Sequence, residues 1–284
     1  MPNLAIRLVF NSNETMLIGK SVYEKLAVII SSMLLSTAAT AADSYQSISH
    51  LGYMDTDGND TVSVDSTYYF APKKTMGPYD QFEYINRTTN VFGSYADDDF
   101  GDVTNIGGEY FVQDFVFGAG YSNYDYGSDT DLFNVSAGYF FNPNLLLKAT
   151  FIDVEDGDNT VMFDLKYNHQ LNSTDYLGFT FTADDEFDYR AVNAKYFMDL
   201  QQGNYLTIEG TISDTDDSGS SWELGSNYYF SKATSAFVTF NKEDDYSFGA
   251  QHFFNKNVGL KAGYANNWDD SDYDAYFANV SLQF

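Results

Sequence analysis

The sequence predicts an all-β protein whose strands run up and down in an antiparallel order. Aromatic residues make up 18% of the 284 residues, yet the mean hydropathy is slightly negative at −0.33. Short segments alternate between apolar and polar residues, which is the period of a strand with two unlike faces. Polar turns and acidic stretches separate these segments, and Pro is scarce, at four residues.

The alternation is regular in the second half of the chain. In residues 177–183, the apolar positions Leu177, Phe179 and Phe181 alternate with Gly178, Thr180 and Thr182. The same pattern recurs in residues 145–151, 161–167, 206–212, 258–264 and 276–284. Each such segment is rich in Val, Ile, Thr, Tyr and Phe, the residues that favour strands.

A hairpin unit repeats along the chain. Its first mark is an aromatic cluster, found at residues 68–70, 110–112, 139–141, 196–198, 228–230 and 252–254, with a weaker one at 167–169 and the chain end at 282–284. Its second mark is an acidic stretch midway between clusters, found at residues 55–60, 97–102, 125–131, 153–158, 184–188, 214–217, 243–245 and 269–274. Eight units predict sixteen strands. Fourteen is the alternative, because residues 79–96 can hold one long strand or a strand with an irregular segment.

Two folds fit this alternation, a soluble sandwich and a transmembrane barrel. The segments have the 9–11 residues that a tilted strand needs to cross a bilayer. The second face is small and polar, as in a water-filled lumen, and the aromatic clusters lie at strand ends, as in an interfacial girdle. A strand in lipid cannot leave an edge unpaired, so the sheet must close. The sequence therefore predicts a transmembrane antiparallel up-and-down β-barrel.

The first 42 residues are predicted to be an N-terminal extension and a cleaved signal peptide, which leaves residues 43–284 as the barrel. Lys20 and Lys25 precede an apolar run over residues 26–35, and Ala39-Thr40-Ala41 fits a small-x-small cleavage pattern. Residues 1–15 have no place in a signal peptide, so Met16 is expected to be the true start. The protein is then exported to the cell outer membrane.

The composition excludes several functions. The formal net charge is −27, with 14 basic and 41 acidic residues, which argues against nucleic-acid binding because phosphate contacts need clustered Lys and Arg. The absence of Cys excludes disulfide scaffolds and thiolate metal sites. No cofactor is expected.

The C-terminal strand resembles the terminal signature of outer-membrane proteins, with alternating Tyr276, Val280 and Leu282 and a final Phe284. The resemblance implies that the barrel assembly machinery reads this strand. Residues 77–87, Gly-Pro-Tyr-Asp-Gln-Phe-Glu-Tyr-Ile-Asn-Arg, resemble the proximal hairpin of the putative general porins of gammaproteobacteria. That resemblance implies a Gram-negative porin for small hydrophilic solutes, with a homotrimer as one assembly. General porins fold a long third loop into the lumen, and this chain has no loop of that length. The lumen is therefore expected to be wide, or to be narrowed by side chains alone.

Residues that could act in catalysis or metal binding are sparse. His169 and His252 fall at the turn side of their strands, far from the acidic stretches, and His50 is expected to face the lumen as a wall residue. The sequence thus shows no catalytic constellation, and the protein is not expected to be an enzyme. Residues 55–60 begin like a Ca²⁺ loop but lack its Glu at the twelfth position, so no metal site is predicted.

The leading hypothesis is a passive channel for small solutes and ions. Charged residues with inward parity are the pore-lining candidates: Lys148, Asp164, Lys166, Lys195, Glu209, Glu223 and Lys261. The acidic stretches gather most carboxylates at one mouth of the barrel, which predicts weak cation selectivity. In the surrounding outer-membrane lipid, divalent ions are expected to bridge these stretches to lipopolysaccharide. The alternative is a non-conducting barrel that acts as an adhesin, a receptor or a structural protein. A transporter of hydrophobic substrates is a weaker alternative, because few residues precede the first strand.

Overall fold

A computed structural model describes residues 43–284 except residue 57, residue 217 and residues 271–272. The predicted extension and signal peptide, residues 1–42, lie outside the described residues. Among the described residues, no helix has the length and apolar character needed to cross a membrane.

The described chain forms sixteen strands. They are β1 (Ser44–Thr56), β2 (Asn59–Lys74), β3 (Asn90–Asp98), β4 (Gly101–Val112), β5 (Phe115–Asp125), β6 (Asp129–Asn142), β7 (Leu145–Val154), β8 (Thr160–Gln170), β9 (Tyr176–Asp184), β10 (Tyr189–Gln201), β11 (Asn204–Thr215), β12 (Gly219–Ser231), β13 (Thr234–Asn241), β14 (Asp245–Asn255), β15 (Val258–Asn267) and β16 (Asp274–Gln283). The predicted count of sixteen is confirmed, and the alternative of fourteen is wrong.

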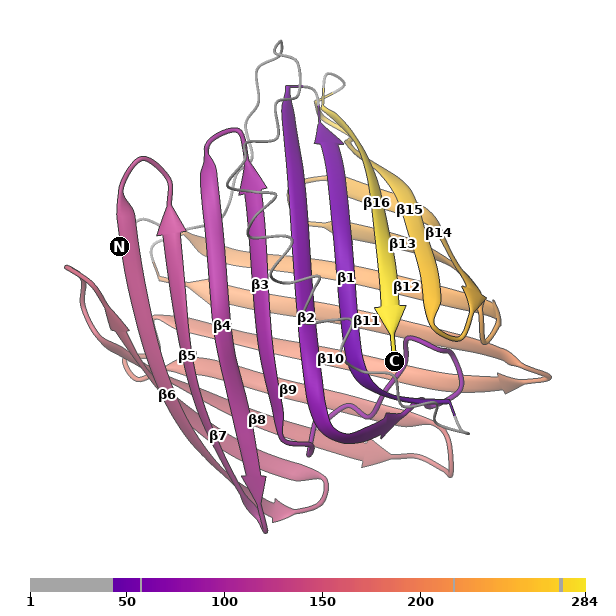
Figure 1. The fold of residues 1–284 in the computed structure, drawn as a ribbon, viewed down its shortest axis with the longest axis horizontal. Helices are drawn as coiled ribbons and strands as arrows, with labels where there is room; N and C mark the ends of the chain where they lie inside the picture. Colours follow the sequence, from indigo (N-terminus) through magenta and orange to yellow (C-terminus); the bar gives the residue numbers. More distant parts are fainter. Residues whose placement is uncertain (1–42, 57, 217, 271–272) are drawn as a thin grey trace.

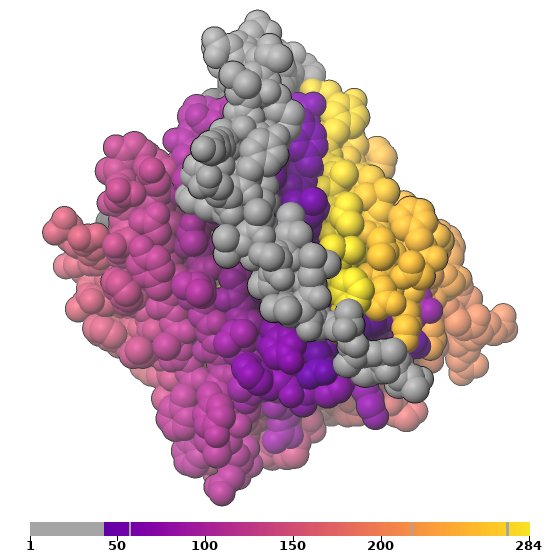
Figure 2. All heavy atoms as spheres, viewed as in Figure 1, coloured from indigo at the N-terminus to yellow at the C-terminus, as the bar shows by residue number. Residues whose placement is uncertain are grey.

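Each strand pairs antiparallel with its neighbours in sequence, and β1 pairs with β16, so the sheet closes into a barrel (Figure 1). The closing register runs from Ile48 opposite Gln283 to Thr56 opposite Ala275. In the space-filling view the indigo β1 lies directly beside the yellow β16 (Figure 2). Closure leaves no strand edge unpaired, as a sheet in lipid requires.

The two ends of the barrel differ. At one end, which we call the turn end, β1 begins, β16 ends and most connections are two residues long. Gln202 and Gly203 form one of these turns, with φ of 56° and 83°, the positive values that tight hairpins use. At the opposite end, the loop end, all eight predicted acidic stretches lie at or next to a hairpin connection. The alternation of turns and acidic connections is therefore confirmed.

The aromatic clusters at the turn end serve both faces of the barrel. Tyr228 and Phe230 point outward with 40% and 57% of their surface exposed, whereas Tyr229 between them is 3% exposed. Phe140 is buried in the same way between the exposed Tyr139 and Phe141. The outer members fit the predicted girdle. The central members point inward, which the girdle interpretation did not anticipate.

These inward aromatic side chains are buried beneath a segment that joins β2 to β3. Residues 75–89, which we call the crossing segment, form neither a hairpin nor a strand, so the expectation of a proximal hairpin is wrong. The reason is local: Gly77 has a φ of 127°, and Pro78 cannot donate a ladder hydrogen bond. The crossing segment instead covers two buried clusters. One contains Ile85, Val116, Phe140 and Leu146, and the other contains Tyr176, Phe197, Tyr205 and Tyr229.

Candidate functional site: a segment across the turn end

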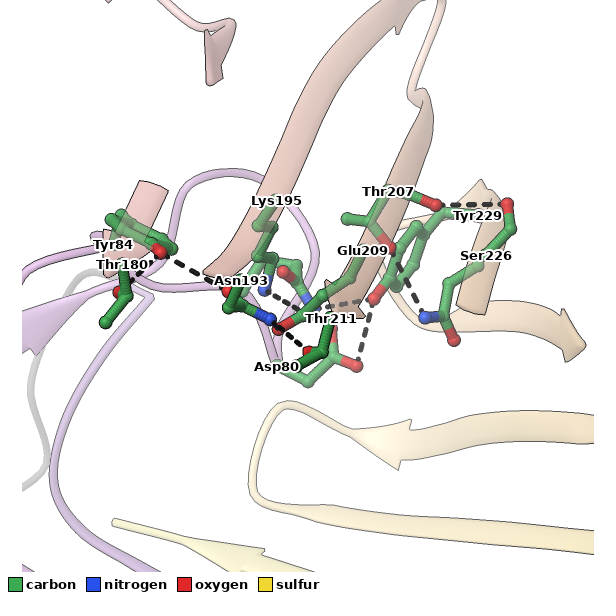
Figure 3. A network of polar contacts seen from close by, with 12 residues as sticks. Asp80, Tyr84, Thr180, Asn193, Lys195, Thr207, Glu209, Thr211, Ser226 and Tyr229 are labelled. Atoms are coloured by element: carbon green, nitrogen blue, oxygen red, sulfur yellow. Dashed lines mark hydrogen bonds and ion pairs between the residues drawn. The ribbon is translucent and has the colours of Figure 1, made fainter. Parts of the chain in front are cut away.

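The crossing segment is held at its middle by Tyr229 of β12 (Figure 3). Gln81 Nε2 donates a hydrogen bond of 2.7 Å to the Tyr229 hydroxyl, and this hydroxyl donates one of 3.2 Å to Asp80 Oδ2. Gln81 is buried, at 8% exposure, so these bonds replace water for polar groups inside the barrel.

A second anchor is Tyr84, which reaches the wall formed by β9 and β10 (Figure 3). Its hydroxyl lies 2.8 Å from Thr180 Oγ1 and donates to Asn193 Oδ1 at 3.3 Å. The ring packs over Gly178, where an added Cβ would lie 2.5 Å from the ring atoms. Gly178 therefore provides the space in which Tyr84 rests.

Further contacts tie the crossing segment to other parts of the barrel. The backbone N–H of Tyr79 donates to the carbonyl of Lys232 at 3.0 Å, and Gln283 Nε2 donates to the Tyr79 carbonyl at 3.1 Å. At its other side, the Arg87 guanidinium lies 4.7 Å from the centroid of the Phe140 ring on β6. The partners lie on opposite parts of the closed sheet, so the crossing segment spans the lumen at the turn end. The expectation that side chains alone would narrow the lumen is therefore wrong.

Asp80 is the ionisable group of this arrangement, and its side chain is only partly shielded from solvent because it also faces a cavity. Burial raises the pKa of the Asp80 carboxyl above its usual value, while the hydrogen bond from Tyr229 and the nearby Lys195 ammonium act in the opposite direction. A proton on Asp80 therefore favours the buried position of the crossing segment.

The predicted pore-lining residues lie on three groups of strands, which are β7 with β8, β10 to β12, and β15. Lys148 Nζ lies 3.4 Å from Glu109 Oε1, and on β8 Asp164 Oδ1 accepts a hydrogen bond of 2.7 Å from Thr182. Lys166 is on the same strand as Asp164 and pairs in register with Leu146. In the second group, Lys195 Nζ lies 4.0 Å from Glu209 Oε2, and Glu223 is paired in register with Thr211. The third group is Lys261 alone, on β15.

A cavity of about 560 Å³ lies beside the crossing segment. Asp80 and Phe82 form one side of it, and inward residues of β14, β15, β16, β1 and β2 form the other. His50 and Lys261 are both among its lining residues, and His50 Nδ1 lies 2.9 Å from Asp65 Oδ2. The crossing segment thus leaves open space on this side of the lumen.

Four residues that hold the crossing segment were not among the sequence candidates: Asp80, Gln81, Tyr84 and Tyr229. The sequence held one indication of them, because the central residue of an aromatic cluster has inward parity. An aromatic ring on the inner wall indicates that something in the lumen covers it. Among residues 43–284 with the gaps given above, no group of three or more His, Cys, Asp or Glu side chains could hold a metal ion.

Comparison with known proteins agrees with this architecture. The Acinetobacter baumannii outer membrane protein Omp33 is 15% identical, with a TM-score of 0.57 over 85% of this chain and 99% of that chain. A triple mutant of Rhodopseudomonas blastica porin is 12% identical, with a TM-score of 0.50 over 84% of this chain and 98% of that chain. These identities support the fold alone. A search of curated proteins found no match.

The family comparison covers most of the chain. The model of a family described as putative general bacterial porin matches residues 23–284. Family and fold together indicate a transmembrane channel rather than an enzyme. The chain therefore belongs to the putative general bacterial porin family.

Proposed function

We propose that the protein is an outer-membrane porin through which small hydrophilic solutes and ions diffuse passively. The observation that carries this proposal is the closed barrel with charged and polar side chains on its inner face and a cavity left open beside the crossing segment. The diffusion path in this proposal runs through this cavity, because the two buried clusters beneath the crossing segment occupy other parts of the turn end. In the outer membrane, the proposed orientation has the turn end facing the periplasm and the loop end facing the outside of the cell.

A weak preference for cations follows from the distribution of charge. The acidic stretches of eight connections surround the loop end, and such a rim concentrates cations over a distance of about 8 Å at physiological salt. Arg190 is one basic residue at this rim, and it pairs with Asp214 and Asp216. The seven charged wall residues named above contribute a second, mixed field along the path.

Planar-bilayer recording of the purified protein tests both statements. Discrete conductance steps are the result expected of a channel, and the reversal potential in a gradient of potassium chloride should indicate K⁺ over Cl⁻. A reversal potential of the opposite sign contradicts the cation preference but leaves the channel intact.

One observation favours the alternative of a non-conducting barrel that acts as a receptor, an adhesin or a structural protein. The crossing segment spans the lumen and is hydrogen-bonded at several places. Under this alternative, the purified barrel inserts into the bilayer without conductance steps. A homotrimer, an interaction with lipopolysaccharide and reading of the Phe284 strand by the barrel assembly machinery are further parts of the proposal, and native electrophoresis in mild detergent tests the first.

A further inference from the structure

The cavity beside the crossing segment has the size of a ligand site. Its volume of about 560 Å³ falls within the range of about 300–1,000 Å³ that is usual for pockets holding small molecules. It lies inside the proposed diffusion path, so the inference drawn here rests on the proposed function. What distinguishes it from a general wet lumen is the chemistry of its lining.

One wall of the cavity carries a row of polar groups. Gln251, Lys261 and Asn279 are direct register neighbours on β14, β15 and β16. Among the described residues, no side-chain hydrogen bond involves the amide of Gln251 or Asn279. Gln251 is also buried, at 9% exposure, so its amide faces little besides the cavity. Each amide has two donor hydrogens and an acceptor oxygen, which lets it exchange hydrogen bonds with a hydroxyl group in both directions.

The same wall carries aromatic rings that lie against glycines. A Cβ at Gly259 would be 2.8 Å from the ring of Phe253, and one at Gly263 would be 2.5 Å from the ring of Phe277. Both rings line the cavity, and Phe82 of the crossing segment lines it from the facing side. The missing side chains of the glycines thus provide the room for apolar ring surface beside the polar row. Such surface suits a solute that has carbon–hydrogen faces as well as hydroxyl groups.

The cavity carries side chains of both signs, so an ion of either sign would meet a group of like charge. Asp65 and Asp80 line it together with Lys261, and His50 lies 2.9 Å from Asp65. An anion would meet two carboxylates, and a cation would meet the Lys261 ammonium. A neutral solute rich in hydroxyl groups uses all of them, since carboxylates accept hydrogen bonds and an ammonium donates them. We propose that this cavity is a binding site for a neutral saccharide of one or two rings.

Titration of the channel current with maltose tests this proposal. Maltose added to both sides of the bilayer should reduce the ion current along a saturable curve, with half-saturation in the millimolar range. Replacement of Asn279 with Ala should raise the half-saturation concentration by about fivefold to tenfold, the weight of one hydrogen bond. Gln251→Ala should act in the same direction. The matched control is Asn105→Ala, because Asn105 is on β4 and outside the cavity lining.

The outcomes separate this proposal from the proposed function. A current that falls in proportion to solution viscosity, as it also does with an inert polyethylene glycol of equal mass, overturns the saccharide site and leaves the porin intact. Equal curves for N279A and N105A also overturn the site. A barrel that inserts but carries no current overturns the porin. In that case calorimetric titration of the detergent-solubilised protein with maltose still decides the site, with no heat of binding as the result against it.

Discussion

The Tyr229 hydroxyl accepts one hydrogen bond and donates another at the middle of the crossing segment, so Tyr229→Phe tests how the segment is held. The substitution keeps the ring, which belongs to the buried cluster with Phe197 and Tyr205, and removes only the hydroxyl. Gln81 Nε2 then loses its acceptor at 2.7 Å, and Asp80 Oδ2 loses a donor at 3.2 Å. Water can replace the two lost hydrogen bonds when the crossing segment moves away from the wall.

The size of the effect follows from these two bonds. A neutral hydrogen bond contributes about 1 kcal/mol net and one to a carboxylate about 1.5–3 kcal/mol, so the loss is at least about 2 kcal/mol. Because about 1.4 kcal/mol changes an equilibrium tenfold, Y229F should raise the ratio of displaced to bound crossing segment about 30-fold.

Single-channel recording measures this ratio as the fraction of time spent in a state of larger conductance. Tyr228→Phe is the matched control, because Tyr228 is the neighbouring residue and points to the outer face with 40% exposure. Y228F should behave like the unmodified protein. Indistinguishable dwell times in Y229F and Y228F would refute the view that these hydrogen bonds hold the crossing segment.

Three further predictions concern other anchors. Acidification should shorten the dwell time of the larger-conductance state, because burial raises the pKa of Asp80. Binding of the crossing segment is then strongest below the usual pKa of 3.8 and weakens as the pH rises through the raised pKa. Recordings of D80N over a pH series should lose this dependence. Gly178→Ala should displace Tyr84 and raise mean conductance, whereas Gly225→Ala, whose Cβ would meet nothing closer than 3.4 Å, should not; equal conductance of the two variants contradicts this. Deletion of Phe284 removes the carbonyl that accepts from Gln46 N and Ser47 N, and it should lower the yield of heat-modifiable barrel on gels relative to the full-length chain.

The fold could be predicted from the sequence because each strand carries its own evidence. In residues 177–183 every second residue is apolar, and this parity alone determines which face meets lipid. Closure follows from the membrane, since no strand edge can stay unpaired in lipid. The count of sixteen depended on residues 79–96. Only residues 90–96 of this range form a strand, because Gly77 and Pro78 direct the crossing segment, which precedes this strand, away from the sheet.

The candidate site could be predicted only in part, for a physical reason. Parity places Lys148, Lys195 and Lys261 on the inner face, but it gives no information about contacts across the lumen. The bond between Gln81 and Tyr229 joins residues 148 positions apart, and nothing local in either sequence segment specifies the other. The sequence predicts a wide lumen, or one narrowed by side chains alone, because no connection at the loop end is long; the segment that narrows the lumen instead enters from the turn end.

The crossing segment depends on the closed barrel for its position. Tyr79 is hydrogen-bonded to Gln283 on the last strand, 204 positions away, and Tyr84 is hydrogen-bonded to Asn193, 109 positions away. Contacts of such long sequence separation must overcome a larger loss of chain entropy than the hairpins do, so we expect them to form after the hairpins. Gln283 is also the inward neighbour of Leu282 and Phe284, the residues of the terminal motif. The strand that closes the barrel therefore also contributes one of the hydrogen bonds that hold the crossing segment, which gives its inward amide a role beside that of its outward apolar residues.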